Sequence, residues 1–128
     1  MQVVLPEIKG SFRFQREERL KKRSEIRKVF NKGRSFACRG AKLFALENGL
    51  ESNRICFTFS KGFAGAVRRN RAKRLGKEAY RALKPRLSRG YDLVLLVYPE
   101  SADTGLADRA GQLGRLFSNA GLVKAGLQ

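Results

Sequence analysis

Residues 59–83 read FSKGFAGAVRRNRAKRLGKEAYRAL, and the part from Val67 onward carries the clearest structural signal in this 128-residue chain. Most of the polar residues from Val67 to Leu83 are Arg or Lys. The apolar residues recur at intervals of three and four, as one face of an α-helix requires: Ala72, Leu75, Ala79, Ala82 and Leu83. The pattern predicts one amphipathic helix over 67–83, which Pro85 then ends or kinks.

The segments on either side of this helix predict a β-sheet. Residues 41–47 (AKLFALE) and 54–60 (RICFTFS) have the composition of strands, and the polar stretch between them predicts a hairpin that pairs the two. Residues 91–98 (YDLVLLVY) are almost entirely apolar after Asp92, which is typical of a strand covered on both faces. We therefore expect 91–98 at the centre of the sheet.

Two further helices are predicted outside these strands. The first begins at Ser24, a favourable N-cap residue, and ends at Gly33, with its apolar residues on one side. The second is capped at its start by Asp103 or Thr104 and ended by Gly121, with helical spacing of the apolar residues in between.

The elements therefore follow in the order helix, two or three strands, basic helix, buried strand, helix. This order predicts an α+β fold, a two-layer α/β sandwich in which both long helices cover one face of the sheet. A chain of this length is expected to form a single domain over 1–128. Because Pro6 and Gly10 discourage regular structure, we expect a flexible N-terminal arm over about 1–12 and a frayed tail over about 122–128.

The charge of the chain indicates a polyanionic partner. Lys and Arg number 28 against 11 Asp and Glu, which gives a formal net charge of +17. The basic residues gather in the windows 13–34 and 68–89, and the second window contains only Glu78 as an acid. Nucleic acid is the favoured partner, because neutralising phosphates releases counterions, and a membrane surface is the alternative. Without a secretory or membrane-spanning apolar run, the chain is expected to be a soluble cytoplasmic protein.

The composition argues against an active site in this polypeptide. The chain has no histidine, and its carboxylates are scattered among basic residues, so acid-base and metal-dependent nuclease schemes both lack their groups. Cys38 and Cys56 are expected to be free thiols, because they lie on predicted strands of a protein in a reducing compartment. Two cysteines without histidine also do not provide a closed zinc site, so we expect no metal on the protein.

Three apolar residues outside the basic helix, Ile26, Phe30 and Phe44, could line a groove between the first helix and the sheet. Exposed aromatic side chains stack on unpaired bases, which is the common route to recognition of single-stranded RNA. The alternative is that all three simply belong to the hydrophobic core. The sequence pattern leaves both interpretations open.

The stretch quoted first resembles the signature of the bacterial ribonuclease P protein subunit, whose core is usually S-K, then A-V-x-R-N-R-x-K-R, then R-E-x-F-R. The upstream segment RLKKRSEIRKVFNKGRS (19–35) is similar to the opening helix of that family. The downstream segment GYDLVLLVYP (90–99) is similar to its buried strand. The resemblance therefore spans roughly Arg19 to Pro99.

The resemblance implies the order α-β-β-β-α-β-α, with a mixed sheet and a left-handed β-α-β crossover through the basic helix. It also implies a noncatalytic subunit of an enzyme that removes the 5′ leader from precursor tRNA, in which the RNA subunit performs Mg²⁺-dependent hydrolysis. Residues expected to bind the catalytic RNA are Arg68, Arg69, Asn70, Arg71, Lys73, Arg74, Lys77, Arg81 and Lys61. Residues expected to form the leader cleft are Ile26, Phe30 and Phe44, with Arg19 and Arg27 near its rim. Neither a membrane nor DNA is expected as a partner.

The chain departs from the family pattern at several positions. Gly62 stands where a second Lys is common, Ala64-Gly65 replaces Gly-Asn, and Lys77 replaces Arg. Tyr80 replaces Phe, and Ile26 occupies a cleft position that often holds Phe, so we expect a weaker grip on the leader. Two other functions stay open: a basic structural RNA-binding protein of the ribosomal type, and a free-standing nuclease.

Overall fold

The computed structural model describes residues 18–63, 65–101 and 105–123. The elements there follow the order that the resemblance implied, with short 3₁₀ turns at Lys84–Arg86 and Pro99–Ser101. The helices and strands are α2 (Arg23–Lys32), β1 (Arg34–Cys38), β2 (Ala41–Glu47), β3 (Arg54–Phe59), α3 (Ala66–Leu83), β4 (Tyr91–Val97) and α4 (Leu106–Asn119).

The four strands form one mixed sheet in the order β1-β2-β4-β3. β4 pairs antiparallel with β2 and parallel with β3, and its residues Leu93 and Leu95 are fully buried, which confirms the predicted central strand. The predicted hairpin between 41–47 and 54–60 is wrong, because β4 lies between these strands. The hairpin partner of β2 is β1, and the apolar β4 gains more burial in the middle of the sheet than at its edge.

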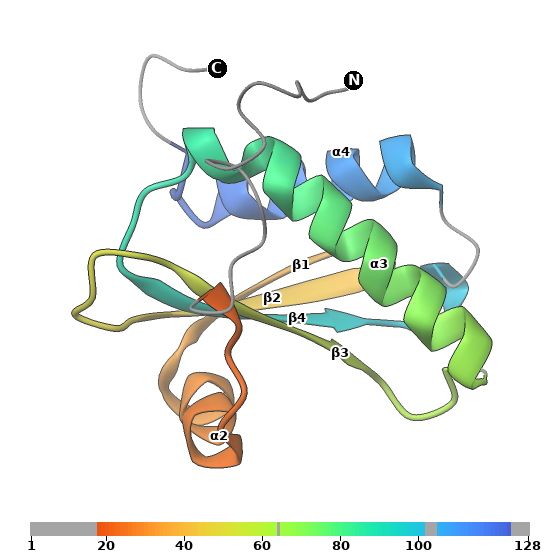
Figure 1. Cartoon of the computed structure of the whole chain (residues 1–128), viewed down its shortest axis with the longest axis horizontal. Coiled ribbons are helices and arrows are strands. Elements are labelled where there is room, and N and C mark those ends of the chain that lie inside the picture. Colours follow the sequence, from red (N-terminus) through yellow and green to blue (C-terminus); the bar gives the residue numbers. More distant parts are fainter. Residues whose placement is uncertain (1–17, 64, 102–104, 124–128) are drawn as a thin grey trace.

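Helices α3 and α4 cover one face of the sheet, as predicted (Figure 1). The chain runs along β3, returns through α3 above the sheet, and enters β4 behind β3, which is the left-handed crossover that the resemblance implied. α3 buries Ala72 and Ala79 as predicted, but Ala82 is exposed. Gly76 and Tyr80 complete the buried face instead.

Helix α2 packs on the opposite face of the sheet (Figure 1). Val29 is its buried contact, and Val94 of β4 and Leu20 are buried beside it. The helix begins at Arg23 with Lys22 as the N-cap residue, so the prediction that Ser24 caps it is wrong. No side chain caps this end, and Glu25 in the first turn supplies the negative charge that a helix N-terminus favours.

The ends of the later helices follow the glycine and proline signals. α3 ends at Leu83, before Pro85, and α4 ends before Gly121, whose φ of 75° is the left-handed geometry of a C-terminal glycine. The predicted caps Asp103 and Thr104 lie outside the described residues, as do the predicted arm over 1–12 and residues 124–128 of the tail.

The first residues of the predicted frayed tail are ordered instead. Leu122 is buried, and its carbonyl accepts a hydrogen bond from the backbone N–H of Ser88 (2.7 Å). Val123 then pairs with Leu87. An apolar side chain at 122 keeps the chain on the core beyond the end of α4.

Both cysteines are free thiols, as expected. Cys38 lies on β1 and Cys56 on β3, at opposite edges of the sheet. Burial raises the pKa of both thiols, so each is less reactive as a nucleophile than an exposed cysteine. Within the described ranges, no helix is long and apolar enough to cross a bilayer.

Candidate RNA-binding surfaces

The first half of α3 presents a dense group of basic side chains to solvent. Every polar residue from position 68 to 74 is exposed, namely Arg68, Arg69, Asn70, Arg71, Lys73 and Arg74. There is no acidic residue between 66 and 77 and no side-chain cap on the helix. Cations near a helix N-terminus repel its positive dipole end, so this arrangement costs helix stability. Helix N-terminal amides and arginines both bind phosphate, and a phosphate partner would offset that cost.

The remaining residues of the predicted catalytic-RNA set extend this surface in both directions. Lys61 is exposed in the turn before α3, and Arg69 donates a long hydrogen bond to the Phe63 carbonyl (3.5 Å). Arg81, about two helical turns beyond Arg74 on α3, pairs with Glu78 (2.7 Å). Its charge is therefore partly neutralised within the protein, and its predicted contact with the catalytic RNA stays a prediction.

Lys77 and Arg19 lie near each other at the β3 edge of the sheet. Burial lowers the pKa of Lys77, and the charges of Arg19 and Lys73 lower it further. The segment of Arg19 is held on this edge, because the backbone N–H of Leu20 donates to the Ile55 carbonyl (3.1 Å) and Arg19 pairs with Ile55. Arg19 was predicted at the rim of the leader cleft, and the structure places it toward the basic side of α3.

The three apolar residues of the predicted cleft come together on the α2 face of the sheet. The Phe30 and Phe44 rings meet edge to face, with 4.7 Å between centroids, and Phe30 is 37% exposed. Ile26 is half-buried and packs against the cluster around Val94. Phe44 is half-buried against the same cluster, so Ile26 and Phe44 both serve partly as core, and Phe30 is the exposed member of the three. Arg27 is exposed on the same helix.

One residue of this surface was missed from the sequence. The Lys42 ammonium lies 5.3 Å from the centroid of the Phe44 ring, within the range of a cation–π contact. Lys42, Phe44 and Leu46 alternate along β2, and the period-2 rule places all three on one face of the sheet. That alternation would have placed Lys42 beside Phe44, but a single lysine in an otherwise apolar strand is not by itself a sign of a binding site.

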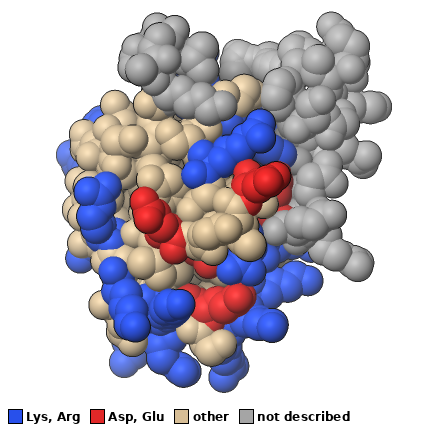
Figure 2. Space-filling model, turned by 90° about the vertical axis from the view of Figure 1, so that its left-hand side faces the viewer, with Lys and Arg blue, Asp and Glu red and all other residues tan. Residues whose placement is uncertain are grey.

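Charge elsewhere on the molecule is more mixed. Figure 2 shows the end opposite to the N-terminus of α3, where acidic side chains lie among the basic ones. Ion pairs neutralise part of the charge away from that N-terminus, including Arg54 with Asp92 (2.7 Å) and Lys84 with Glu18. The described residues contain no group of three or more Cys, Asp or Glu arranged to hold a metal ion.

Comparison with known proteins agrees with the resemblance. A sequence model of the family described as "Ribonuclease P" matches residues 14–121. The ribonuclease P protein component of Alkaliphilus metalliredigens is 38% identical over 109 residues, which cover 85% of this chain and 98% of that protein. That of Natranaerobius thermophilus is 47% identical over 77 residues, which cover 60% of this chain and 67% of that protein.

Two solved structures share the fold. The Staphylococcus aureus RNase P protein superposes with a TM-score of 0.76 at 22% identity, covering 84% of this chain and 98% of that one. The Thermotoga maritima RNase P protein superposes with a TM-score of 0.73 at 24% identity, covering 80% of this chain and 96% of that one.

Proposed function

Because the chain belongs to the ribonuclease P protein family, we propose that it is a noncatalytic subunit that binds two RNAs at once. Members of this family are protein components of an endoribonuclease of tRNA processing. The catalytic RNA binds along α3, and the 5′ leader of precursor tRNA binds in the cleft between α2 and the sheet. The active site, with its Mg²⁺, belongs to the RNA. The absence of histidine from the whole chain is consistent with this division of labour.

The basic surface of α3 is the observation that carries the proposal. Four arginines and a lysine lie within seven consecutive residues, Arg68 to Arg74, on a helix N-terminal half that contains no acid. Guanidinium groups bind phosphate oxygens in pairs, and a helix of this length presents them along a line that a folded RNA backbone can follow. The opposite side of the helix is fixed in the core by Ala72, Ala79 and Tyr80, so the surface is rigid.

The cleft supports a different kind of contact. Single-stranded RNA is bound by stacking of its bases on aromatic rings, with cations nearby to hold its phosphates. Phe30 is exposed and Phe44 half-exposed, the Lys42 ammonium lies over the Phe44 ring, and Arg27 is exposed three residues before Phe30 on α2. Arg19 lies near Lys77 of α3. A precursor tRNA held by the catalytic RNA could therefore place its leader in the cleft.

A cleavage assay tests this function. Precursor tRNA is incubated at low Mg²⁺ with the protein alone, with the catalytic RNA alone, and with both. We expect cleavage to be stimulated only in the mixture, because the protein supplies charge neutralisation and substrate affinity but no catalytic group. Cleavage by the protein alone would show a free-standing nuclease. An unstimulated mixture would favour a structural RNA-binding protein instead.

A further inference from the structure

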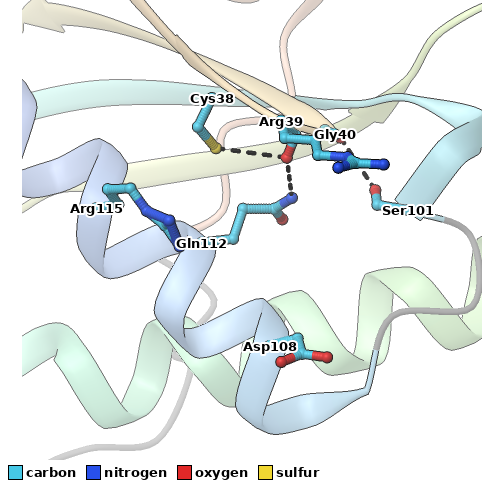
Figure 3. A pocket seen from close by; sticks show the side chains of 7 residues that line it. All are labelled: Cys38, Arg39, Gly40, Ser101, Asp108, Gln112 and Arg115. Carbon is cyan, nitrogen blue, oxygen red and sulfur yellow. Dashed lines mark hydrogen bonds between the residues drawn. The ribbon is translucent and has the colours of Figure 1, made fainter.

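A polar pocket of about 310 Å³ lies between the β1–β2 turn and α4, on the side of the sheet opposite to α2. Figure 3 shows that its walls come from the turn, from the 3₁₀ turn after β4, and from α4. Two exposed arginines line it, Arg39 from the turn and Arg115 from α4. Asp108 is the single acid among its lining residues, and Figure 3 shows it one helical turn away from Gln112.

The pocket walls are held by hydrogen bonds between these three segments. The Gln112 side-chain amide donates to the Arg39 carbonyl (2.9 Å), and the Ser101 hydroxyl donates to the Gly40 carbonyl (3.0 Å). Gly40 has a φ of +86°, and a Cβ there would come within 2.9 Å of both Gln112 and Ser101. The turn therefore approaches α4 as closely as its backbone allows, which gives the pocket a fixed shape.

A buried arginine stands directly behind this wall. Arg109 is fully buried, and it donates to the Gln112 side-chain oxygen (2.6 Å) and to the Ser101 carbonyl (3.1 Å). Both partners are uncharged, and within the described residues its Nε atom has no hydrogen-bond partner. Burial lowers the pKa of Arg109, and the positive charge of Arg71 lowers it further.

Among the described residues at this pocket, positive charge exceeds negative charge. Three arginines, Arg39, Arg109 and Arg115, stand at or behind the wall against one aspartate, a formal excess of two positive charges. Burying a guanidinium beside neutral groups alone is expensive, and a neutral residue of similar volume would tie α4 to the turn at lower cost. An anion bound in the pocket would neutralise this excess positive charge, which the fold itself does not need.

We propose that this pocket binds a phosphate group of the same RNA that α3 contacts, so that the RNA-binding surface extends from α3 onto α4 and the β1–β2 turn. The proposal rests on the proposed function. Two observations support RNA as the source of the phosphate. α3 and α4 begin at the same end of the molecule (Figure 1). The positive charge of Arg71, in the basic group of α3, acts on Arg109. Arg39 and Arg115 would hold the phosphate, and Arg109 acts as a positioning residue through Gln112.

Titration of the free protein with inorganic phosphate, at an ionic strength held constant with chloride, tests the pocket without any RNA. The readout is the NMR signal of the Gln112 side-chain amide and of the Gly40 backbone amide. We expect saturable shifts of both signals, and binding weakened roughly tenfold in Arg39→Gln/Arg115→Gln, as loss of charge-assisted hydrogen bonds predicts. Asp108→Asn should tighten binding, because it removes the single acid of the pocket. Signals that stay still, or that move equally in all variants, would overturn the pocket.

Affinity for the catalytic RNA, measured over a range of salt, tests the source of the phosphate. The double variant should lower the slope of log affinity against log salt by about 0.7 to 0.9 for one lost phosphate contact. Arg89→Gln is the matched control, because Arg89 is exposed in the turn before β4, whereas the pocket lies beyond the other end of that strand. If the wild-type protein binds inorganic phosphate as expected but the double variant keeps the wild-type salt slope for RNA, the pocket binds free phosphate and the RNA assignment is overturned. If the wild-type protein does not bind the catalytic RNA, the proposed function fails, and the phosphate titration alone decides whether the pocket binds an anion.

Discussion

Gly76 sets how closely α3 approaches the sheet. A Cβ at this position would lie 2.7 Å from the ring of Phe57 on β3, closer than real side chains pack. Glycine in a helix interior normally costs about 1 kcal/mol relative to alanine, and here the cost is offset by a tighter fit between helix and strand.

Two glycine substitutions should therefore change stability in opposite directions. Gly76→Ala should destabilise the protein by about 1–3 kcal/mol through overpacking against Phe57. Gly111→Ala in α4, where an added Cβ meets nothing within 4 Å, should stabilise it by about 0.5–1 kcal/mol. Urea unfolding of both variants measures the two effects. A stabilising Gly76→Ala would show that the helix is free to move away from the sheet.

Tyr80, which stands where the family usually has Phe, gives the stability a pH dependence. Burial of its phenol, reinforced by the negative charge of Glu18, raises its pKa above the ordinary value of 10.0. The unfolded chain therefore releases this proton at a lower pH than the folded protein. The stabilisation is fully present below about pH 10 and is lost as the pH rises through the folded pKa.

Tyr80→Phe is accordingly expected to flatten the fall in stability above about pH 10, because Phe has no proton to release. The measurement is the free energy of unfolding from urea titrations between about pH 8 and pH 11. Equal slopes for the wild type and the variant would mean that Tyr80 does not control alkaline unfolding.

At the scale of elements, α2 is tied to the sheet by an ion-pair network as well as by apolar packing. Arg54 of β3 makes two hydrogen bonds to the carboxylate of Asp92 on β4 (2.8 and 2.7 Å) and also reaches Glu25 of α2 (3.4 Å). Asp92 is buried, whereas Glu25 is half-exposed. This junction therefore helps to set the orientation of α2 on the sheet.

Removing Arg54 should cost much more than removing its outer partner. Arg54→Met leaves the buried Asp92 with Asn48 as its remaining hydrogen-bond donor here, and we expect a loss of about 2–4 kcal/mol. Glu25→Gln removes a longer, partly solvated contact and should cost less than about 1 kcal/mol. Thermal or urea unfolding decides between them, and similar losses for both variants would contradict the ranking of the two contacts.

The positions of helices and strands along the chain were easier to predict from sequence than the pairing of strands in the sheet. α3, β4 and the helix ends at Pro85 and Gly121 followed from periodicity and from proline and glycine. The pairing of strands did not, because alternation places a residue on a face but does not identify the adjacent strand.

The site was predictable to a similar extent. The basic residues at the start of α3 were expected to be exposed, and they are, because each lies off the apolar stripe. Arg109 gave no signal, because a charged residue in a helix is expected to be solvated and its burial depends on the turn packed against α4. Lys42 also gave no signal, because its cation–π contact depends on the Phe44 ring two residues further along the strand.

At the scale of the whole molecule, the net charge of +17 should make salt act in opposite directions on folding and on binding. Raising NaCl from about 0.01 M to about 0.15 M shortens the Debye length from about 30 Å to about 8 Å and screens the self-repulsion of the free protein. We expect its melting temperature to rise over this range while its affinity for the catalytic RNA falls. A melting temperature that falls with salt would mean that internal ion pairs outweigh the repulsion.

The central claim is that α3 and the cleft bind different RNAs, and the most direct test measures two affinities in the same variants. Arg69→Ala should weaken binding of the catalytic RNA. Phe44→Leu, which removes the ring but keeps an apolar side chain, should leave that affinity unchanged. In the assembled enzyme it should weaken binding of leader-bearing precursor tRNA by about 1 kcal/mol or more, as loss of base stacking predicts, and leave mature tRNA unaffected. If Phe44→Leu weakens precursor and mature tRNA equally, or if both variants lose affinity for the catalytic RNA, the two surfaces do not have separate roles and the account is wrong.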